Sequence, residues 1–349
     1  MKKILALILA LVMILALAAC GNTAPAPAPA AAPTEQQSEE TAPADTAEEP
    51  AKPVKIGYIT SDPSSGFWKE VLESFQNACS EEGVDLVYQI ASDSAGMRSA
   101  YDSLLTQEVD IIVDGYSIEE IANAYAEEAV DTGMPFMAVA FNCPVEGAYS
   151  YGTSNDGMGV SFGEFAAESV KKEWDGQIDL IVTANAYTAV PAMASRTDKA
   201  VETLLETPGF EYLKDVEWVK IDTGLDTSTI GANTANTILS HPDAEHIVYI
   251  VCTDAFCPTI VNALADSGAS DKVLMLSSDC TSTYIDYAKA AAASDEWSPW
   301  YGSLDLQTAT YGNKLLAKAL AILNGENPEA YTEHSGVMVT KYNINDFYG

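Results

Sequence analysis

The stretch KIGYITSDPSSGFWKEVLESFQNACSEEGVDL, residues 55–86, holds the first copy of a pattern that recurs along the chain. Residues 55–60 combine β-branched and aromatic residues and predict a strand, and residues 85–90 predict another. Between them, residues 67–82 carry apolar side chains at helical spacing. These side chains are Phe67, Trp68, Val71, Leu72, Phe75 and Cys79. Two short strands separated by one helix indicate a parallel pair joined by a crossover.

The same alternation continues along the chain. Further strands are predicted at residues 110–113, 135–141, 177–183, 216–222, 246–251 and 273–278. Further helices are predicted at residues 95–105, 118–131, 158–174, 192–206, 228–240, 255–268, 281–292 and 308–324. This order indicates parallel sheets with helices on both faces, so the expected fold class is α/β. Because residues 54–349 exceed the ~250 residues at which a single hydrophobic core stops growing, two lobes are expected.

The chain is strongly acidic, with 51 Asp and Glu residues against 17 Lys and Arg and a formal net charge of −34. Nucleic acid is therefore not an expected partner, because phosphate binding needs clustered basic residues. The excess of acids is explained more simply as a means of keeping an exported protein soluble. It also disfavours an anionic ligand unless a local cation compensates.

The first residues have the pattern of a secretory signal peptide. Two lysines precede an unbroken apolar run, residues 4–19, which is shorter than the ~20 residues of a membrane-spanning helix. The end of the run, LAAC at residues 17–20, resembles the bacterial lipobox, which implies cleavage before Cys20 and a diacylglycerol on its thiol. Residues 1–19 are therefore predicted to be a lipoprotein signal peptide. The alternative is an ordinary signal peptide cut after an Ala-x-Ala-like site.

Residues 20–53 are rich in Ala, Pro and Glu and contain no aromatic residue. Such a segment buries too little apolar surface to fold. Alternating Ala and Pro, followed by repeated acids, favours an extended spacer. We therefore expect a lipidated cysteine and a disordered linker that holds a folded body away from the membrane.

The body contains five cysteines, an odd number that cannot pair fully within one chain. Most have apolar neighbours in the sequence and are predicted to be buried thiols. Cys252 and Cys257 leave a metal-binding pair open, but neither has a histidine or a second pair of cysteines nearby. No metal and no other cofactor is therefore expected. The five cysteines are Cys79, Cys143, Cys252, Cys257 and Cys280.

The sequence lacks the common motifs of catalysis. It has three histidines but no Gly-x-Ser-x-Gly elbow, no His-Glu-x-x-His and no phosphate-binding Gly-Lys-Ser/Thr run. Carboxylates are abundant, yet abundance is no sign of a catalytic pair with different environments. The protein is therefore not expected to be an enzyme, and glycoside hydrolysis remains an unfavoured alternative.

Several stretches together resemble type I periplasmic binding proteins of the ribose/galactose kind. Besides residues 55–86, they are GMPFMAVAF (133–141), YSYGTSNDGMGVSFGEFAAESV (149–170), HIVYIVCTDAFCPTIVNALADSGASDKVLMLSSD (246–279) and YGNKLLAKALAILNGE (311–326). The likeness extends over residues 54–342 and lies in the order of these blocks more than in any one motif.

The resemblance implies two Rossmann-like lobes with parallel sheets, joined by a three-strand hinge. The three crossovers would lie near residues 154–156, 301–305 and 331–335. The first lobe would comprise residues 54–155 and 306–333, and the second lobe residues 156–305 and 334–349. The resemblance also implies hinged closure around a ligand, a membrane permease that reads the closed form, and a separate subunit that hydrolyses ATP.

Ligands bind beyond the carboxyl ends of the strands in open parallel sheets, and the resemblance implies particular residues there. Phe67 and Trp68 match an aromatic pair that follows a polar position, here Ser65. The alternative for the two rings is packing at the start of a helix. Arg196, one of two arginines in the chain, falls where the family has a ligand-binding arginine. Its alternative is a surface ion pair.

Asp279 matches a family aspartate that accepts hydrogen bonds from ligand hydroxyls. Thr253 replaces a family asparagine and offers fewer donors, while the adjacent Asp254 is expected to cap the following helix. The Asp-Arg pair of ribose-binding members is replaced by a ring at Phe141, which Asn142 follows, and this disfavours ribose itself. Weaker candidates for the cleft are Tyr116, Tyr187, Trp300, Asp305 and Gln307.

Together these features predict an extracytoplasmic, lipid-anchored substrate-binding protein of an ABC transporter. We expect a monomer that captures a sugar between its lobes and delivers it to a permease. The alternatives are a nucleoside or another small polar solute, or a sensory role in which ligand is presented to a receptor. A related family of transcription regulators shares the two-lobe body, but it needs a basic helix-turn-helix where this chain has a signal-like segment.

Overall fold

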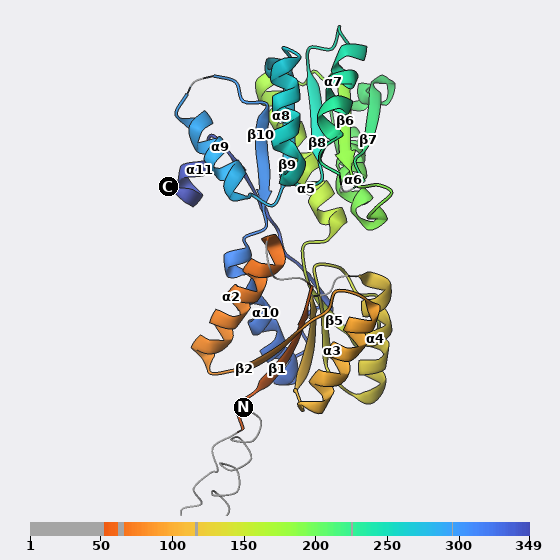
Figure 1. Ribbon diagram of the computed structural model, residues 1–349, viewed down its shortest axis with the longest axis vertical. Coiled ribbons are helices and arrows are strands. Elements are labelled where there is room, and N and C mark those ends of the chain that lie inside the picture. Colours follow the sequence, from red (N-terminus) through yellow and green to blue (C-terminus); the bar gives the residue numbers. More distant parts are fainter. Residues whose placement is uncertain (1–51, 62–65, 116–117, 225, 295) are drawn as a thin grey trace, which may run out of the picture. The chain divides into compact units, whose positions relative to one another are not determined.

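The computed structural model describes residues 52–61, 66–115, 118–224, 226–294 and 296–349 (Figure 1). The predicted signal peptide, Cys20 and the linker up to residue 51 lie outside these residues, as do Ser65 and Tyr116. Residues 52–349 form one unit by themselves, and it contains two six-stranded sheets.

The first sheet has the strand order β11-β5-β4-β3-β1-β2, and all its neighbouring strands are parallel. Its strands are β1 (Lys55–Thr60), β2 (Asp85–Ile90), β3 (Ile111–Gly115), β4 (Phe136–Val139), β5 (Tyr149–Gly152) and β11 (Tyr331–Glu333). Its helices are α2 (Gly66–Glu82), α3 (Ser94–Thr106), α4 (Glu119–Thr132) and α10 (Thr308–Leu323). Helix α10 packs against α2, although the two helices lie far apart in the chain (Figure 1). A late segment of the chain thus belongs to the layer that covers the first sheet.

The second sheet has the order β12-β10-β9-β8-β6-β7. Its strands are β6 (Leu180–Asn185), β7 (Glu217–Asp222), β8 (Ile247–Val251), β9 (Val273–Ser278), β10 (Trp300–Asp305) and β12 (Val337–Thr340). Its helices are α5 (Asn155–Trp174), α6 (Ala194–Glu206), α7 (Ile230–Ser240), α8 (Cys257–Asp266), α9 (Ser282–Ala292) and α11 (Ile344–Tyr348). Four 3₁₀ turns interrupt the loops: η1 (Pro191–Met193), η2 (Glu211–Asp215), η3 (Asp254–Phe256) and η4 (Ser270–Lys272).

The predicted α/β fold with two lobes is confirmed, with one correction to the sheets. Strand β12 pairs with β10 in the antiparallel sense, so the second sheet is not wholly parallel. The sequence pattern also failed to predict strands β5, β10, β11 and β12. Three of these have only three or four residues, and β10 includes a glycine and a serine.

The chain passes between the two sheets three times, as the hinge prediction requires. Strands β1 to β5 belong to the first sheet and β6 to β10 to the second, after which β11 returns to the first and β12 to the second. The connecting segments are β5 to β6, β10 to β11 and β11 to β12. Each therefore leaves one lobe and enters the other.

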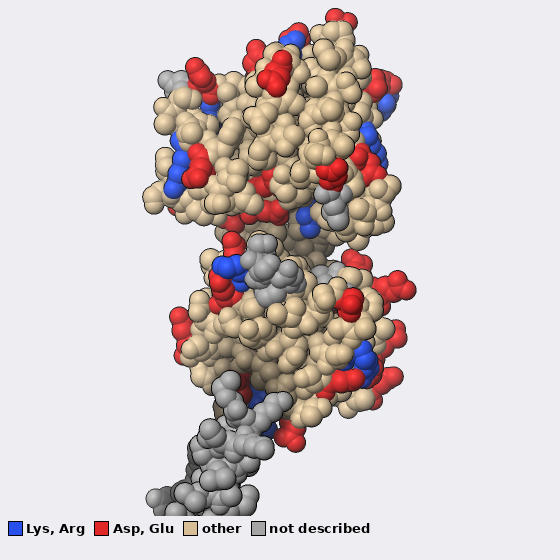
Figure 2. All heavy atoms as spheres, viewed as in Figure 1, with Lys and Arg blue, Asp and Glu red and all other residues tan. Residues whose placement is uncertain are grey.

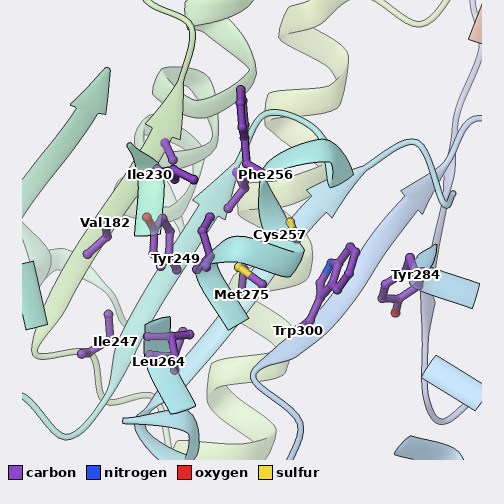
Figure 3. Close-up of a cluster of buried hydrophobic side chains, with 14 of the residues drawn as sticks. Val182, Ile230, Ile247, Tyr249, Phe256, Cys257, Leu264, Met275, Tyr284 and Trp300 are labelled. Atoms are coloured by element: carbon purple, nitrogen blue, oxygen red, sulfur yellow. The ribbon is translucent and has the colours of Figure 1, made fainter. Parts of the chain in front are cut away.

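Strand β8 explains why central strands read as unbroken apolar runs. All five of its residues are buried. Ile247, Tyr249 and Val251 point to the core on one face, together with Met275 and Trp300 (Figure 3). Val248 and Ile250 belong to the core on the opposite face. Because alternate residues of a strand face opposite sides, a sheet covered by helices on both faces needs apolar residues at every position.

The cysteine prediction is confirmed: Cys79, Cys143, Cys252, Cys257 and Cys280 are all free and buried. Burial raises the pKa of the Cys79 thiol to about 12 and that of Cys252 to about 11. The described residues contain no group of three or more His, Cys, Asp or Glu that could hold a metal ion. No helix among them is long and apolar enough to cross a membrane.

Candidate ligand-binding cleft

Loops at the carboxyl ends of the strands of both sheets surround a cavity of about 340 Å³. The first lobe contributes Phe67 and Trp68 from α2, Glu119 from α4, Ala140 and Phe141 after β4, and Thr153 after β5. Asn155, the first residue of α5, also lines the cavity, and the second lobe contributes Met158, Val190, Ala192, Met193, Arg196 and Asp279. Leu306, which follows β10, completes the lining. This is the edge where parallel sheets bind their ligands.

Aromatic rings form the first-lobe side of the cavity. Phe67 and Trp68 stand edge to face in the first turn of α2, with ring centroids 4.9 Å apart and an interplanar angle of 84°. Phe67 also meets the buried ring of Tyr311, with centroids 5.5 Å apart. Phe141 follows Ala140, whose φ of 69° lies in the left-handed region and redirects the chain at the end of β4. The rings are thus held by packing on their far sides, which keeps their orientation fixed.

Arg196 lies in the first turn of α6 and is held by two hydrogen bonds. Its Nε donates to Oδ1 of Asn155 at 2.6 Å, and its Nη1 donates to the carbonyl of Cys252 at 3.2 Å. Asn155 is itself fixed, because its Nδ2 donates to the carbonyl of Ala192 at 3.0 Å. A guanidinium has five N–H donors, so these two bonds leave further donors for a ligand.

Asp279 follows β9 and faces the cavity from a strained turn. Its φ is 103°, and the next residue, Cys280, has a φ of 45°. Its Oδ2 accepts a hydrogen bond from Oγ1 of Thr253 at 2.5 Å, while Oδ1 accepts from Oγ of Ser278 at 3.2 Å. Thr253 itself is not among the residues that line the cavity. It orients the carboxylate of Asp279, which does line the cavity.

Asp254 is a buried acid directly behind Asp279. Its Oδ1 accepts from the hydroxyls of Ser277 and Ser303 at 2.6 and 2.8 Å. Its Oδ2 accepts from the backbone N–H and the hydroxyl of Thr281 at 2.8 and 3.0 Å. Burial, with the nearby charge of Asp279, raises the pKa of Asp254 to about 7. Asp254 was expected to cap α8, but it bonds the start of α9 and ties it to β9 and β10.

Two further cavities adjoin the central one. One of about 510 Å³ shares Glu119, Phe141, Asn155 and Ala192 with it and adds Asn142, Ser154, Asp156, Ser195 and Tyr331. The other, of about 240 Å³, shares Phe67, Asp279 and Leu306 and adds Gly66, Glu70, Thr281, Ser282 and Thr308. The added residues are mostly polar, so the two adjoining cavities are more polar than the central one.

A family model described as a periplasmic binding protein domain matches residues 56–327. The chain belongs to the periplasmic binding protein family. This assignment agrees with two lobes whose loops enclose a cavity and with three passages of the chain between the sheets. The family predicted from the order of the sequence blocks is therefore confirmed. No curated protein sequence matches the chain significantly.

Solved structures of other periplasmic binding proteins share the fold. An ABC transporter periplasmic solute binding protein from Actinobacillus succinogenes 130z, with bound D-allose, is 16% identical with a TM-score of 0.67, covering 85% of this chain and 100% of that one. AraP, an arabinose binding protein from Geobacillus stearothermophilus, is 18% identical with a TM-score of 0.67, covering 85% of this chain and all of its own. At such identities the likeness shows the fold alone.

The structure brings together five of the residues predicted for the binding protein's cleft, namely Phe67, Trp68, Phe141, Arg196 and Asp279. Asn142 lines the larger adjoining cavity. Asp305 and Gln307 line none of these cavities: Oδ1 of Asp305 accepts from the Gln307 N–H at 2.7 Å and Oδ2 accepts from the Tyr348 hydroxyl at 2.8 Å. They shape the connection into α10.

Two weaker candidates are occupied by other contacts. Trp300 is 2% exposed and lies in the core of the second lobe, where its Nε1 donates to Oγ of Ser277 at 2.7 Å (Figure 3). The hydroxyl of Tyr187 lies 2.8 Å from Oγ1 of Thr183 and 2.9 Å from Oγ1 of Thr197. Trp300 can therefore not touch a ligand in the cleft.

Sequence reasoning missed several lining residues. Asn155 was placed before a helix predicted to begin at Met158, but α5 begins at Asn155, where the Ser154 hydroxyl caps it by accepting from the Gly157 N–H at 2.9 Å. A serine before Asn-Asp-Gly is a capping signal that could have moved this boundary. Met158 and Met193 carry no such signal, because an apolar residue at helical spacing looks the same whether it faces a core or a cavity.

His334 links all three connections between the lobes. Its Nε2 lies 2.8 Å from the carbonyl of Leu306, which can only accept, so Nε2 carries the proton. Its Nδ1 then accepts from the Tyr151 hydroxyl at 2.7 Å. Its carbonyl accepts from Oγ1 of Thr153 at 2.6 Å. Burial lowers the pKa of His334, which favours this neutral form.

Proposed function

We propose that the protein is an extracytoplasmic, lipid-anchored binding protein that captures a sugar between its lobes and delivers it to the permease of an ABC transporter. One observation carries the proposal: a cavity with aromatic rings from one lobe and with Arg196 and Asp279 from the other. The ligands of two proteins with the same fold, D-allose and arabinose, support it.

The chemistry of the cavity suits a neutral polyol. An aromatic ring such as Trp68 can lie against the C–H face of a sugar, while directed polar groups fix its orientation. Arg196 supplies donors to sugar oxygens, and Asp279 accepts from sugar hydroxyls. Both side chains are already oriented by protein partners, Asn155 and Thr253. Binding therefore requires little ordering of these two groups.

Lobe closure is the second part of the proposal. The lobes would comprise residues 54–155 with 306–333 and residues 156–305 with 334–349. The membership of β11 in the first sheet and of β12 in the second supports these limits, as does the packing of α10 on α2. Rotation about the three connections would bring the cavity walls together around a ligand.

Anchoring, localisation and partners complete the proposal. Residues 1–19 would be a signal peptide, Cys20 the lipidated residue, and residues 20–53 a linker, as their sequence pattern suggests. The partners would be a permease and a separate ATPase, and the protein would act as a monomer without catalysing a reaction. Lys and Arg side chains stand beside acids on the face shown in Figure 2 and form no broad basic patch there, in keeping with a partner other than nucleic acid.

Ligand binding is tested with the mature chain, a panel of sugars and nucleosides, and thermal unfolding. A ligand that binds only the folded state raises the melting temperature. Trp68 fluorescence provides a second signal, because this ring lines the cavity. A rise in melting temperature with a sugar supports the proposal. The absence of any rise across the panel contradicts it.

The two arginines of the chain form a matched pair of variants. Arg196→Ala is expected to lower the affinity for the sugar roughly 10- to 100-fold, as for loss of a hydrogen bond to a charged group. Arg98→Ala is the control, since Arg98 lies on α3 and pairs with Asp102 and with Glu128, the latter at 2.6 Å. It should leave affinity unchanged. Equal affinities of the two variants would place Arg196 outside the binding site.

The anchor is tested separately by metabolic labelling with a radioactive fatty acid. Full-length chain is expected to carry the label and to sediment with membranes, and Cys20→Ser is expected to lose both properties. Label that persists in Cys20→Ser contradicts lipidation at this residue without affecting the ligand-binding proposal.

A further inference from the structure

The central cavity is more apolar than a simple sugar requires. Nine of its fourteen lining residues have apolar side chains. They are Phe67, Trp68, Ala140, Phe141, Met158, Val190, Ala192, Met193 and Leu306. A sugar ring presents apolar C–H groups on its two faces, and the three aromatic rings of the first lobe suffice to cover them. The second lobe adds Met158, which is 4% exposed and packs in the lobe's core, and the partly buried Val190 and Met193. Their remaining accessible surface makes the cavity still more apolar.

Three of those side chains come from separate points of the second lobe. Met158 lies in the first turn of α5, Val190 precedes η1 and Met193 ends it. Thioether and isopropyl groups offer a sugar hydroxyl no useful hydrogen-bond partner. A hydroxyl that leaves water without gaining a partner weakens binding. Methionine, in contrast, adapts its shape to an apolar group.

Two of the polar groups that suit hydroxyls are shared between the central cavity and its neighbours. Asn155, bonded to Arg196, is shared with the 510 Å³ cavity. Asp279, bonded to Thr253, is shared with the 240 Å³ cavity. Hydrogen-bonding groups are therefore shared with the two neighbouring cavities, whereas Met158, Val190 and Met193 line the central cavity alone.

Given the proposed function, we infer that the ligand is a sugar that carries a hydrocarbon substituent, such as an alkyl or aryl glycoside. The sugar hydroxyls bind Arg196 and Asp279, and the substituent lies against Met158, Val190 and Met193. A nucleoside suits this wall less well, because the edge of its base carries donors and acceptors that these three side chains cannot bond.

A matched ligand series tests the inference on the unaltered mature chain. Calorimetry gives the Kd for glucose, galactose, allose and arabinose and for the methyl and phenyl glycosides of each. For the sugar that binds most tightly, the phenyl glycoside is expected to bind about tenfold or more tightly than the free sugar, through burial of the ring. The methyl glycoside is expected to lie between them.

The outcomes separate this inference from the function on which it rests. A free sugar that binds as tightly as its phenyl glycoside overturns the inference and leaves sugar binding intact. A chain that binds no sugar and no glycoside, although its thermal transition shows it to be folded, overturns both. A nucleoside that binds more tightly than every glycoside also overturns the inference.

Variants locate the substituent. Met193→Gln keeps the size of the side chain and adds a polar group, so the ratio of phenyl-glycoside affinity to free-sugar affinity is expected to fall severalfold. Val190→Thr is an independent second variant with the same expectation. Met134→Gln is the control, because Met134 packs at the core of the first lobe outside the cavity. An unchanged preference in both cavity variants contradicts the inference.

Discussion

The first lobe brings three aromatic rings and one acid, Glu119, to the cavity, whereas the second lobe brings Arg196, Asp279 and two methionines. The strand orders, β2-β1-β3-β4-β5-β11 and β7-β6-β8-β9-β10-β12, are the same except for the antiparallel last strand of the second sheet. Equivalent loops therefore reach the cavity from both sides. The comparison teaches that this topology determines where a loop ends, while the side chains at its tip determine what it binds.

The lobes also differ in the ionisable group that each one buries. Lys318 of α10 is 7% exposed, and its Nζ donates to the carbonyls of Ser150 and Glu329 at 2.8 and 2.7 Å and to Oγ1 of Thr332 at 2.8 Å. It thereby joins β5 to the edge strand β11. Asp254, 2% exposed, joins β9, β10 and α9. Lys318 and Asp254 thus each hold segments near the connections, with side chains of opposite charge.

The largest expected effect comes from removing these ions. Asp254→Ala leaves four hydrogen-bond donors without their acceptor and is expected to lower the free energy of unfolding by about 4 kcal/mol. Lys318→Ala leaves several carbonyls without their donor and is expected to have an effect of similar size. Denaturant unfolding measures both.

Ligand affinity distinguishes the two variants. Asp254 lies behind Asp279 and should affect binding as well as stability, whereas Lys318 lines none of the cavities described and should affect stability alone. An equal loss of sugar affinity in both variants would show that the two buried ions do not differ in this way.

As pH rises, stability is expected to fall in the range where Asp254 titrates and to rise in the range where Lys318 titrates. The folded pKa of Asp254, about 7, lies above the usual value of 3.8 for an aspartate, so the folded state holds more protons between these values and stability falls as pH rises through them. The effect is on the order of 4 kcal/mol. Asp254→Asn should lack it, and the difference between the two stability curves measures it.

Lys318 supplies the contrasting case. Burial lowers its pKa to about 8, below the usual value of 10.5 for a lysine, so the folded state holds fewer protons between these values and stability rises as pH rises through them. Lys318→Met should remove this rise. If the two variants shift the curve in the same direction, the assignment of charge to one of the buried groups is wrong.

Removal of one aromatic ring from the cavity wall is expected to have a smaller effect, and this effect is on ligand affinity. Phe141→Ala is expected to weaken sugar binding about tenfold, because the ring contributes apolar contact area to the ligand. Phe136→Leu, a change within the buried strand β4, is the control and should alter stability rather than affinity. Calorimetry measures both variants. Unchanged affinity in Phe141→Ala would mean that the first lobe binds through other residues.

The smallest change in stability is expected from His334, which lies at the connections between the two lobes. His334 has a lowered pKa, so the folded state resists protonation and stability is lost as pH falls below about 6.5, the usual value for histidine. His334→Gln should flatten this part of the curve and change stability by about 1 kcal/mol or less. A curve for His334→Gln parallel to that of the unaltered chain would contradict a neutral buried imidazole.

Local periodicity predicted most helices and central strands, and the reason lies in burial. Strands such as β8 are covered on both faces, so every residue is apolar and the run is visible in the sequence. Strands β5 and β11 are short and lie toward one edge of the first sheet, where fewer neighbours constrain their composition. The antiparallel β12 could not be predicted, because the direction of a strand is decided by the path of the chain between the lobes.

The sequence by itself determined the two-lobe α/β fold, the family, and the ring pair and arginine that reach the cavity. The alternation of strands and helices indicated the fold, and the resemblance of the sequence blocks to a known family implied the family, the ring pair and the arginine. Only the tertiary structure decided that Met158, Val190 and Met193 meet in one wall and that Thr253 orients Asp279. It likewise decided that Asp254 and Lys318 are buried. Such contacts join residues far apart in the chain, and nothing in their local spacing distinguishes a residue that faces a cavity from one that faces a core.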